Sequence, residues 1–197
     1  MNVKSRRITL ADILPAEQYA AERKSRRAAM IEYKRNRRVA VGPHATFYFE
    51  NYAIMLGQVQ EMLHTEKGGA AQIEDELVAY NPLIPQGAEL VATLMFEIED
   101  PVRRLAILRT LTKIEESAFI EIGGERVMAA PEQDVERTAP DGKTSSVHFL
   151  HFHFSPAQIA AFKSSARQVL IGFTHANYAH MTALAGDARA ALAEDFA

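Results

Sequence analysis

The chain has no cysteine among its 197 residues. This absence excludes disulfide bonds, thiolate metal ligands, iron–sulfur ligation and cysteine nucleophiles. No apolar run approaches the roughly 18 residues that a membrane span requires, and the N-terminus is too charged for a secretory signal peptide. We therefore expect a cytoplasmic protein without a membrane partner.

Familiar catalytic motifs are missing as well. There is no G-x-S-x-G nucleophile motif, and Ser155 has its hydroxyl occupied as a helix cap. The glycine pairs at 68–69 and 123–124 lack the spacing and the following Lys-Ser/Thr of a phosphate loop. The sequence therefore identifies no catalytic residue.

The composition is that of an ordinary globular protein, with 48% hydrophobic and 24% charged residues. A chain of this length suits one domain with a sizeable core. We predict a single domain over residues 1–197, in which a basic helical segment, 1–38, precedes an α+β body, 39–197.

The hydrophobic periodicity and the turn signals predict an α+β fold, with a mixed or antiparallel sheet of about five or six strands and helices packed on it. Helices are expected over residues 15–38, 52–66, 71–80, 101–113, 156–166 and 181–194, and strands within 39–49 and over 90–98, 118–122, 125–129, 147–154 and 169–174. Residues 131–146 are expected to form a polar loop.

The clearest local prediction is a hairpin that turns at Gly123 and Gly124. Counting outward from the turn pairs Glu121 with Arg126 on one face, which places opposite charges side by side. The segment that begins with Ser155 has the sequence of a capping box with proline at the first helical position, so a helix is expected to start there.

Polar residues interrupt the apolar stretch 47–99. Buried polar groups cost free energy unless they are paired, so this stretch predicts a hydrogen-bonded network or a binding site. Its members are Glu50, Asn51, Gln58, Gln60, Glu61, Tyr80, Asn81, Glu89 and Glu97.

Two groups of residues could bind a metal. Glu61 and His64 form a Glu-x-x-His motif on a predicted helix, but a di-iron site needs a second such motif, which the sequence lacks. His151 and His153 share one face of a predicted strand, and His148 takes the opposite face. Histidines on half-exposed strands are more often unliganded, so we expect no tightly bound metal and no cofactor.

Charge is distributed unevenly along the chain. Residues 1–38 have 11 Lys/Arg and 4 Asp/Glu, a net charge of +7, and the remainder has a net charge of −10. The basic clusters at 4–7, 23–27 and 34–38 could bind nucleic acid, or the basic helix could bind acidic surface of its own protein or of a second copy. We favour the second interpretation, and a homodimer is one form of it.

Several motifs in order resemble an uncharacterised bacterial family, domain of unknown function three-five-zero-one. They are ITLADILPAEQY, KRNRRVAVG, FENYAIMLGQVQEML, YNPLIPQGAELVATLMFEIED, IGGERV and HANY, and together they cover nearly the whole chain. The resemblance implies a redox context, because family members are often encoded beside rubrerythrin-like and iron–sulfur oxidoreductase proteins. The family more often has Arg or Lys at positions 64 and 151, which argues against metal ligands there.

The resemblance also extends the candidate ligand-binding set to the HANY segment. The set is Glu50, Asn51, Gln58, Gln60, Glu61, Tyr80, Asn81, Glu97, His175, Asn177 and Tyr178; the family pattern further includes Glu89 and Thr93. Three hypotheses for function follow. The first is a non-enzymatic interaction or accessory protein, with a protein partner or a second copy. The second is a small-molecule or metal-dependent enzyme that uses the network around Glu61, Tyr80, Glu97 and His175, and the third is nucleic-acid binding.

We expect random duplex and single-stranded DNA to bind no more tightly than micromolar, because the basic helix has acidic surface of its own protein available to it. Titrations at low and at physiological salt check this expectation. Submicromolar affinity that falls steeply with added salt would contradict it, since that slope reports release of counterions from neutralised phosphates.

Overall fold

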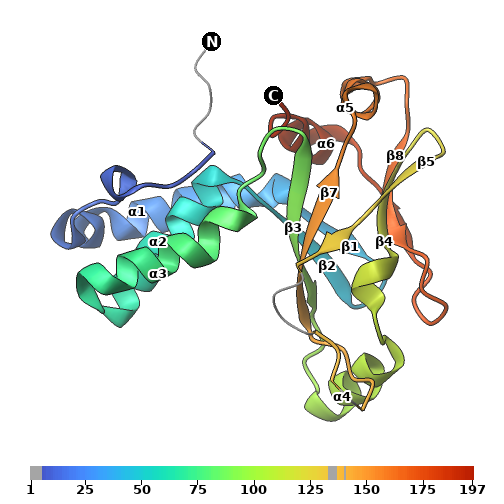
Figure 1. Ribbon diagram of the computed structural model, residues 1–197, viewed down its shortest axis with the longest axis horizontal. Helices are drawn as coiled ribbons and strands as arrows, with labels where there is room; N and C mark the ends of the chain where they lie inside the picture. Colours follow the sequence, from blue (N-terminus) through green and yellow to red (C-terminus); the bar gives the residue numbers. More distant parts are fainter. Residues whose placement is uncertain (1–5, 133–136, 140) are drawn as a thin grey trace. The chain divides into compact units, whose positions relative to one another are not determined.

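The computed structural model describes residues 6–132, 137–139 and 141–197, and it has an α+β fold (Figure 1). The helices are α1 Ala16–Lys34, α2 Tyr52–Glu66, α3 Gly69–Tyr80, α4 Pro101–Thr110, α5 Pro156–Lys163 and α6 Gly186–Ala193. The strands are β1 Arg38–Val41, β2 Ala45–Glu50, β3 Glu89–Phe96, β4 Ala118–Ile122, β5 Glu125–Met128, β6 Ala130–Pro131, β7 Val147–His153, β8 Val169–Phe173 and β9 Met181–Ala183. None of the helices in these ranges is long and apolar enough to cross a membrane.

The chain divides into two compact units. Unit 1 comprises the described part of Met1–Arg35 together with Glu50–Gln86, and unit 2 comprises Asn36–Phe49 and Gly87–Ala197. The sequence analysis grouped residues 52–80 with the body of the protein, whereas their contacts group them with α1.

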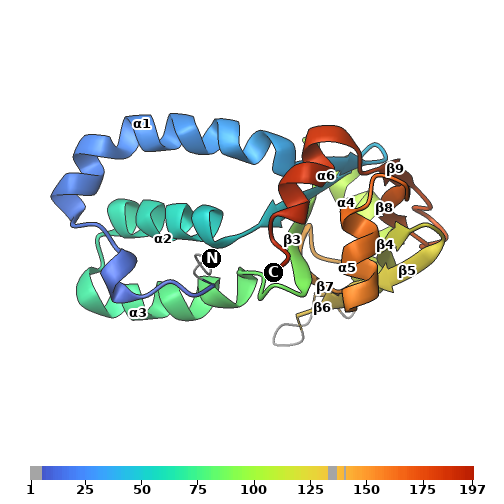
Figure 2. The same ribbon diagram turned by 90° about the horizontal axis from the view of Figure 1, so that it is seen from above.

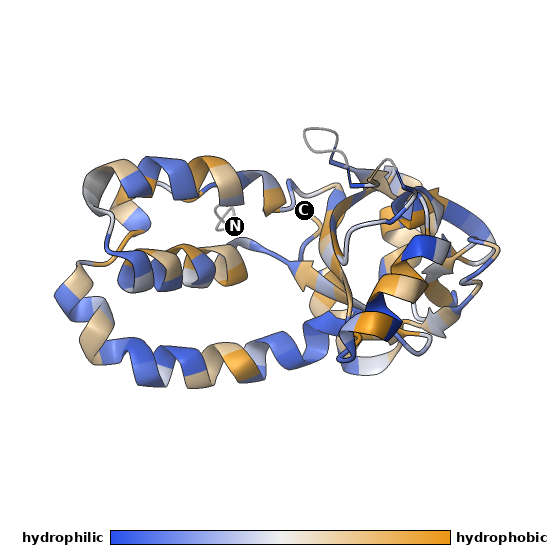
Figure 3. Ribbon diagram, turned by 90° about the horizontal axis from the view of Figure 1, so that it is seen from below, coloured by the Kyte–Doolittle hydropathy of each residue, from blue (hydrophilic) through white to orange (hydrophobic). Residues whose placement is uncertain are grey.

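Unit 1 contains α1, α2 and α3, which run alongside one another with α2 in contact with both neighbours (Figure 2). The side chain of Asn51 caps α2 by accepting a hydrogen bond from the amide of Ile54, and Lys67 ends the helix in the left-handed conformation. Polar residues dominate α1, with apolar residues only at intervals (Figure 3). A helix of this kind buries little apolar surface, so other contacts must hold it in place.

Unit 2 contains two sheets, with strand orders β1-β2-β3-β7-β6 and β5-β4-β8-β9. The sheets pack on each other through buried aromatic rings, such as Phe47 of β2 and Phe173 of β8, whose centroids are 5.3 Å apart. Phe154, Phe162 and Phe196 form a second cluster, in which the rings meet edge to face at centroid distances of 5.0–6.0 Å.

The local predictions with explicit turn or cap signals are confirmed. β4 and β5 pair in the predicted register, with Glu121 opposite Arg126 and an ion pair of 2.8 Å between them. The Ser155 capping box is present at the start of α5. The predicted helix 52–66 matches α2 residue for residue.

Predictions that depended on distant pairing were less accurate. The helix predicted over 181–194 is wrong for residues 181–185, because Met181–Ala183 pairs with β8 as an edge strand and α6 begins only at Gly186. The predicted α+β fold with antiparallel strands is confirmed, and its strands form two sheets, since the β4–β5 hairpin pairs with β8. The helix predicted over 15–38 is an α-helix to Lys34 and continues as a 3₁₀ helix over Arg35–Arg37. Lys4 and part of the predicted loop 131–146 lie outside the described residues.

Arg37 explains why the first helix ends before residue 38. Its side chain is 2% exposed, and its guanidinium donates to the carbonyls of Phe49 at 3.1 Å and Ala191 at 3.0 Å and to the carboxylate of Asp195. These bonds connect the start of β1 to the C-terminal end of α6. A residue of the predicted basic face is therefore part of the interior of unit 2.

We expect Arg37→Ala to reduce the free energy of unfolding by about 3–5 kcal/mol, because it leaves the buried Asp195 carboxylate without its guanidinium. Urea denaturation followed by circular dichroism measures the loss. Arg35→Ala is the matched control, since its ion pair with Glu32 is exposed and contributes only about 0–1 kcal/mol. Equal losses for the two variants would contradict this role of Arg37.

Candidate functional site

Glu61 on α2 is the centre of the polar contacts between α1 and α2. Its carboxylate accepts a hydrogen bond of 2.6 Å from the hydroxyl of Tyr19 and two bonds, of 3.0 and 2.9 Å, from the guanidinium of Arg23. Arg27 lies 3.9 Å away. Tyr19, Arg23 and Arg27 are on successive turns of one face of α1, so a single carboxylate contacts two turns of the neighbouring helix.

These contacts keep Glu61 ionised. The hydrogen bonds from Arg23 lower the pKa of Glu61 from its ordinary 4.5 to about 2, and burial together with the Glu61 carboxylate raises the pKa of Tyr19 to about 12. A carboxylate with so low a pKa is a poor general base at neutral pH. The role of Glu61 is therefore structural: its carboxylate holds α1 against α2.

Other predicted site residues of unit 1 also bind the backbone or a neighbouring side chain. Gln60 accepts a bond of 2.8 Å from the amide of Leu14, and Asn81 both donates to and accepts from the backbone of Ile8. Asn51 donates to the hydroxyl of Tyr33 at 2.7 Å in addition to capping α2.

Tyr80 and Gln58 form a further pair in unit 1. Burial raises the pKa of the Tyr80 hydroxyl, and the hydrogen bond with Gln58 opposes that rise. Glu50, at the end of β2, is also buried. The polar residues of the stretch 47–81 thus connect the N-terminal segment, α1 and α2 at several separate points.

The remaining predicted residues belong to unit 2. Glu97 accepts hydrogen bonds from Thr46 and Tyr48, and the bond from Thr46 lowers its pKa most. His175 contacts the carbonyl of Thr112 at 3.1 Å. Glu61 and Tyr80 therefore lie in one compact unit, and Glu97 and His175 in the other.

The HANY segment, residues 175–178, hydrogen-bonds to the turn between β1 and β2. The buried hydroxyl of Tyr178 accepts bonds from the amides of His44 and Ala45 and donates to the carbonyl of Val41, all at 2.9–3.0 Å. Asn177 donates to the carbonyl of Thr110 at the end of α4. These bonds satisfy backbone groups in a tight turn, which is a structural role.

An apolar groove in unit 1 lies between α1 and α2. It encloses about 810 Å³, and its apolar lining includes Leu14, Tyr19, Met30, Ile31, Tyr33, Tyr52 and Leu56. Gly57 faces Met30 so closely that an added Cβ would lie 3.2 Å from the methionine methyl group. Gly57 and Met30 both line the groove, as does Ile31, which is 71% exposed.

The lining of the groove has charged residues of both signs, with Asp12 and Glu61 among the acidic ones. Arg26, Arg27 and Lys34 are the basic ones, and a second hollow of about 490 Å³ shares Arg27 and Ile31 and adds Arg23 and Lys24. Every Lys and Arg of α1 thus lines one of the two hollows. Arg23 and Arg26 also pair with carboxylates of unit 1.

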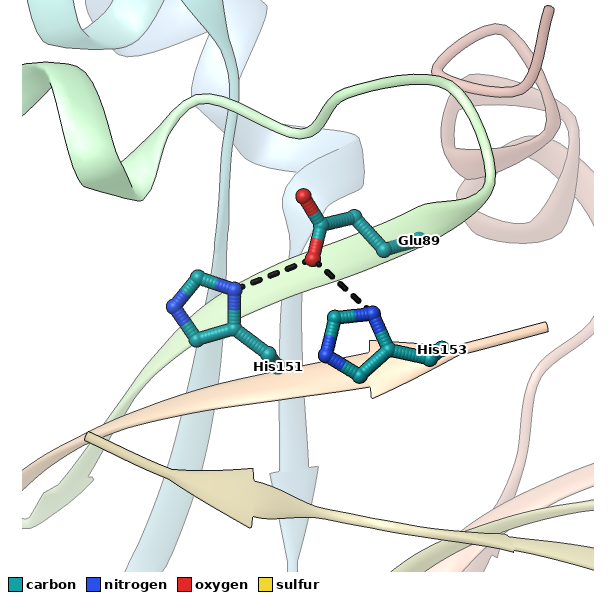
Figure 4. A group of neighbouring side chains, drawn as sticks. All are labelled: Glu89, His151 and His153. Atoms are coloured by element: carbon teal, nitrogen blue, oxygen red, sulfur yellow. Dashed lines mark hydrogen bonds and ion pairs between the residues drawn. The ribbon is translucent and has the colours of Figure 1, made fainter. Parts of the chain in front are cut away.

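A second arrangement of interest lies in unit 2, where β3 and β7 pair. Glu89 is opposite His153 in the register, and His151 is two residues earlier on the same face. One oxygen of the Glu89 carboxylate lies 3.0 Å from Nδ1 of His151 and 3.3 Å from Nδ1 of His153 (Figure 4). The hydrogen bond with Glu89 raises the pKa of His151.

The predicted alternation of the three histidines on β7 is confirmed. His148 is fully buried on the opposite face, in contact with the carbonyl of Ser145 at 2.9 Å, and burial lowers its pKa. His64, in contrast, contacts the ring of Tyr19 and is separate from this cluster. The contact of His151 and His153 with Glu89 was not predicted from the sequence, although Glu89 stood out there as a polar residue in an apolar stretch.

We expect Glu61→Gln to lower the stability of unit 1 at neutral pH by about 1–2 kcal/mol, a value reduced from the full pKa difference because Glu61 and Arg23 are partly exposed. Since the folded pKa is lowered, the stabilisation is complete above about pH 4.5 and is lost as the pH falls toward about 2. Unfolding measured from pH 7 to pH 2 should show the wild-type and variant curves converging at the acid end.

Glu74→Gln is the control for this experiment, because Glu74 is exposed on α3. It should leave the pH profile unchanged. A constant difference between wild type and Glu61→Gln across the whole range would contradict the assignment of the stabilisation to the ionised carboxylate.

Comparisons with known proteins cover nearly the whole chain. A solved structure, described as a novel protein of unknown function from Burkholderia pseudomallei K96243, is 36% identical, with 96% of this chain and 99% of that chain covered and a TM-score of 0.88. No match is found among curated proteins. The family model described as "Protein of unknown function (DUF3501)" matches residues 7–196, and the chain therefore belongs to the DUF3501 family.

Proposed function

We propose that this protein is a bacterial, cytoplasmic accessory protein without catalytic activity, and that the groove of unit 1 binds a helix of a partner protein. The observation that supports the proposal most is the combination of an open apolar groove with Ile31 71% exposed in its lining. Exposed apolar residues that gather around a concave surface are typical of binding sites.

The charge of the groove indicates the chemistry of the partner. Arg26, Arg27, Asp12 and Glu61 line the groove, with Arg26 beside Glu22 and Arg27 beside Glu61. The contacts proposed for a partner are Lys34 of the groove and Lys24 of the adjoining hollow. An amphipathic helix with acidic flanks would place its apolar face over Met30 and Ile31 and its carboxylates beside these cations. Such a helix-in-groove complex gains affinity from the apolar contact, and the charges select the partner.

A redox protein is the candidate partner that the family resemblance suggests. The resemblance implies that family members are often encoded beside rubrerythrin-like and iron–sulfur oxidoreductase proteins, and the proposal of an accessory role in such a system rests on that association. The groove defines only the recognition chemistry, which is an apolar helix with acidic flanks.

The enzyme hypothesis for the polar network has less support. Glu61 is held ionised by Arg23, and the residues named for the network are bonded to backbone groups or to neighbouring side chains in two different units. A reaction site would need several of these groups to face a common cavity.

Nucleic-acid binding also has less support, because several arginines of the basic clusters are paired within the protein. Arg23 pairs with Glu61, Arg26 with Glu22, and Arg37 with Asp195 in the interior of unit 2. Guanidinium groups that already bind carboxylates must give up those contacts before they can bind phosphate.

We expect a fluorescently labelled helical peptide, with leucines at i, i+3, i+4 and i+7 and glutamates on its flanks, to bind the full chain. The same peptide with lysines in place of the glutamates should bind at least about tenfold more weakly. Ile31→Glu should weaken binding of the acidic peptide by about tenfold or more, because it places a carboxylate at the centre of the apolar contact. Fluorescence anisotropy measures all three affinities.

Val78→Glu is the matched control, because Val78 is 76% exposed on α3 and does not line the groove. It should leave the affinity unchanged. Equal affinity for the two peptides, or no effect of Ile31→Glu, would contradict the proposal. A wild-type dimer in sedimentation that Ile31→Glu converts to a monomer would assign the groove to a second copy of the chain instead.

A further inference from the structure

We propose that Glu89, His151 and His153 form a binding site for a divalent first-row transition cation, with Zn²⁺ as the representative ion. The three side chains project from β3 and β7 toward one another (Figure 4), and their ligand atoms lie within 4.8 Å of one another. This site lies in unit 2 and is independent of the groove of unit 1.

The spacing of the ligand atoms fits a single ion. Zinc bonds to histidine nitrogen and carboxylate oxygen are about 2.1 Å long, so two neighbouring ligand atoms are about 3.0 Å apart in octahedral and about 3.4 Å apart in tetrahedral geometry. The Glu89 oxygen lies 3.0 Å from Nδ1 of His151 and 3.3 Å from Nδ1 of His153. The three ligand atoms all lie within 4.8 Å of one another, and an ion would bind after the three side chains adjust around it.

The backbone holds the ligands at this spacing. The β3–β7 pairing sets Glu89 opposite His153, and the two-residue period of the strand places His151 on the same face. The imidazole rings are nearly parallel, with 18° between their planes and 6.0 Å between their centroids. In both rings the nitrogen that faces the carboxylate is Nδ1.

Glu132 supplies the outer contact that metal-bound histidines commonly have. Its carboxylate lies 3.9 Å from Nε2 of His151, the nitrogen that faces away from Glu89. A proton held on Nε2 leaves the lone pair of Nδ1 directed toward the proposed ion. Glu132 is itself positioned by a backbone bond to Phe149 of β7.

The proposed site is accessible to solvent, and its three protein ligands do not fill the coordination sphere of a metal ion. The side chain of Glu89 is 9% exposed and that of His153 is 67% exposed, so an ion can enter from solvent and is supported from within the sheet. Two histidines and one carboxylate leave at least one coordination position for water or another ligand. This ligand set favours zinc or iron over magnesium or calcium, which prefer oxygen ligands.

We expected no tightly bound metal because the Glu-x-x-His motif is single, cysteine is absent and histidines on half-exposed strands are usually unliganded, and the family residues at position 151 also argued against a ligand there. None of these observations could include Glu89, which is 62 residues from His151 in the sequence. An arginine or lysine at position 151 would pair with Glu89 as a cation. Histidine can make the same pair when protonated and becomes a metal ligand when neutral.

Isothermal titration of tag-free, chelator-treated protein with Zn²⁺ at pH 7.5 tests the proposal. We expect one equivalent to bind, and His153→Ala and Glu89→Gln each to raise the dissociation constant at least about tenfold, because each removes one of three ligands. His153 is largely exposed, so His153→Ala remains informative if Glu89→Gln fails to fold, which circular dichroism would reveal.

His175→Ala is the control for nonspecific binding by histidine, because His175 lies outside the cluster and contacts the carbonyl of Thr112. It should leave the affinity for Zn²⁺ unchanged. Absence of binding, or binding that His153→Ala leaves unaltered, would overturn the proposal. A loss of affinity in His175→Ala equal to that in His153→Ala would overturn it as well, since the binding would then be a general property of surface histidines.

Discussion

The ionised carboxylate of Glu61 is the contact on which the architecture of unit 1 depends. The helix α1 has few apolar residues to bury, so the hydrophobic effect alone cannot hold it against α2. The hydrogen bonds from Tyr19 and Arg23 to Glu61 supply a polar attachment instead. The helix α1 contacts α2 through these separate polar bonds and not through a continuous apolar interface. Apolar surface between the two helices therefore remains accessible as the groove. The same interaction that stabilises the unit therefore creates its candidate binding surface.

Local sequence signals predicted most of the secondary structure, and the reasons are physical. Asn51, Ser155 and the glycine pair at 123–124 act within a few residues, so their caps and turn can be derived without knowledge of the fold. Strand β9 could not be derived in this way, because Met181–Ala183 becomes a strand only by pairing with β8. The division of the strands into two sheets has the same cause. Arg37 was assigned to a basic face because its partner, Asp195, is 158 residues away.

The candidate site residues were also difficult to interpret from the sequence, because their partners are distant along the chain. The sequence shows polar residues among buried ones, and the structure pairs most of them with backbone groups or with neighbouring side chains, as buried polar groups require. Hydrogen bonding alone does not distinguish a residue with a structural role from a residue of a reaction site. The group of Glu89, His151 and His153 differs from these structural contacts because three side chains that can each bind a metal lie close together. The His-x-His pattern was visible in the sequence, but the third ligand came from a different strand.

Amide hydrogen exchange over Ala16–Lys34 tests the central claim most directly, which is that Glu61 holds α1 in place. In Glu61→Gln at neutral pH, the account predicts faster exchange throughout α1, because the attachment to Tyr19 and Arg23 is weakened, and unchanged exchange in β3 and β7 of unit 2. Unchanged protection of α1 would show that other contacts hold the helix. Faster exchange in both units alike would show that the substitution destabilises the whole protein, and either result would contradict the account.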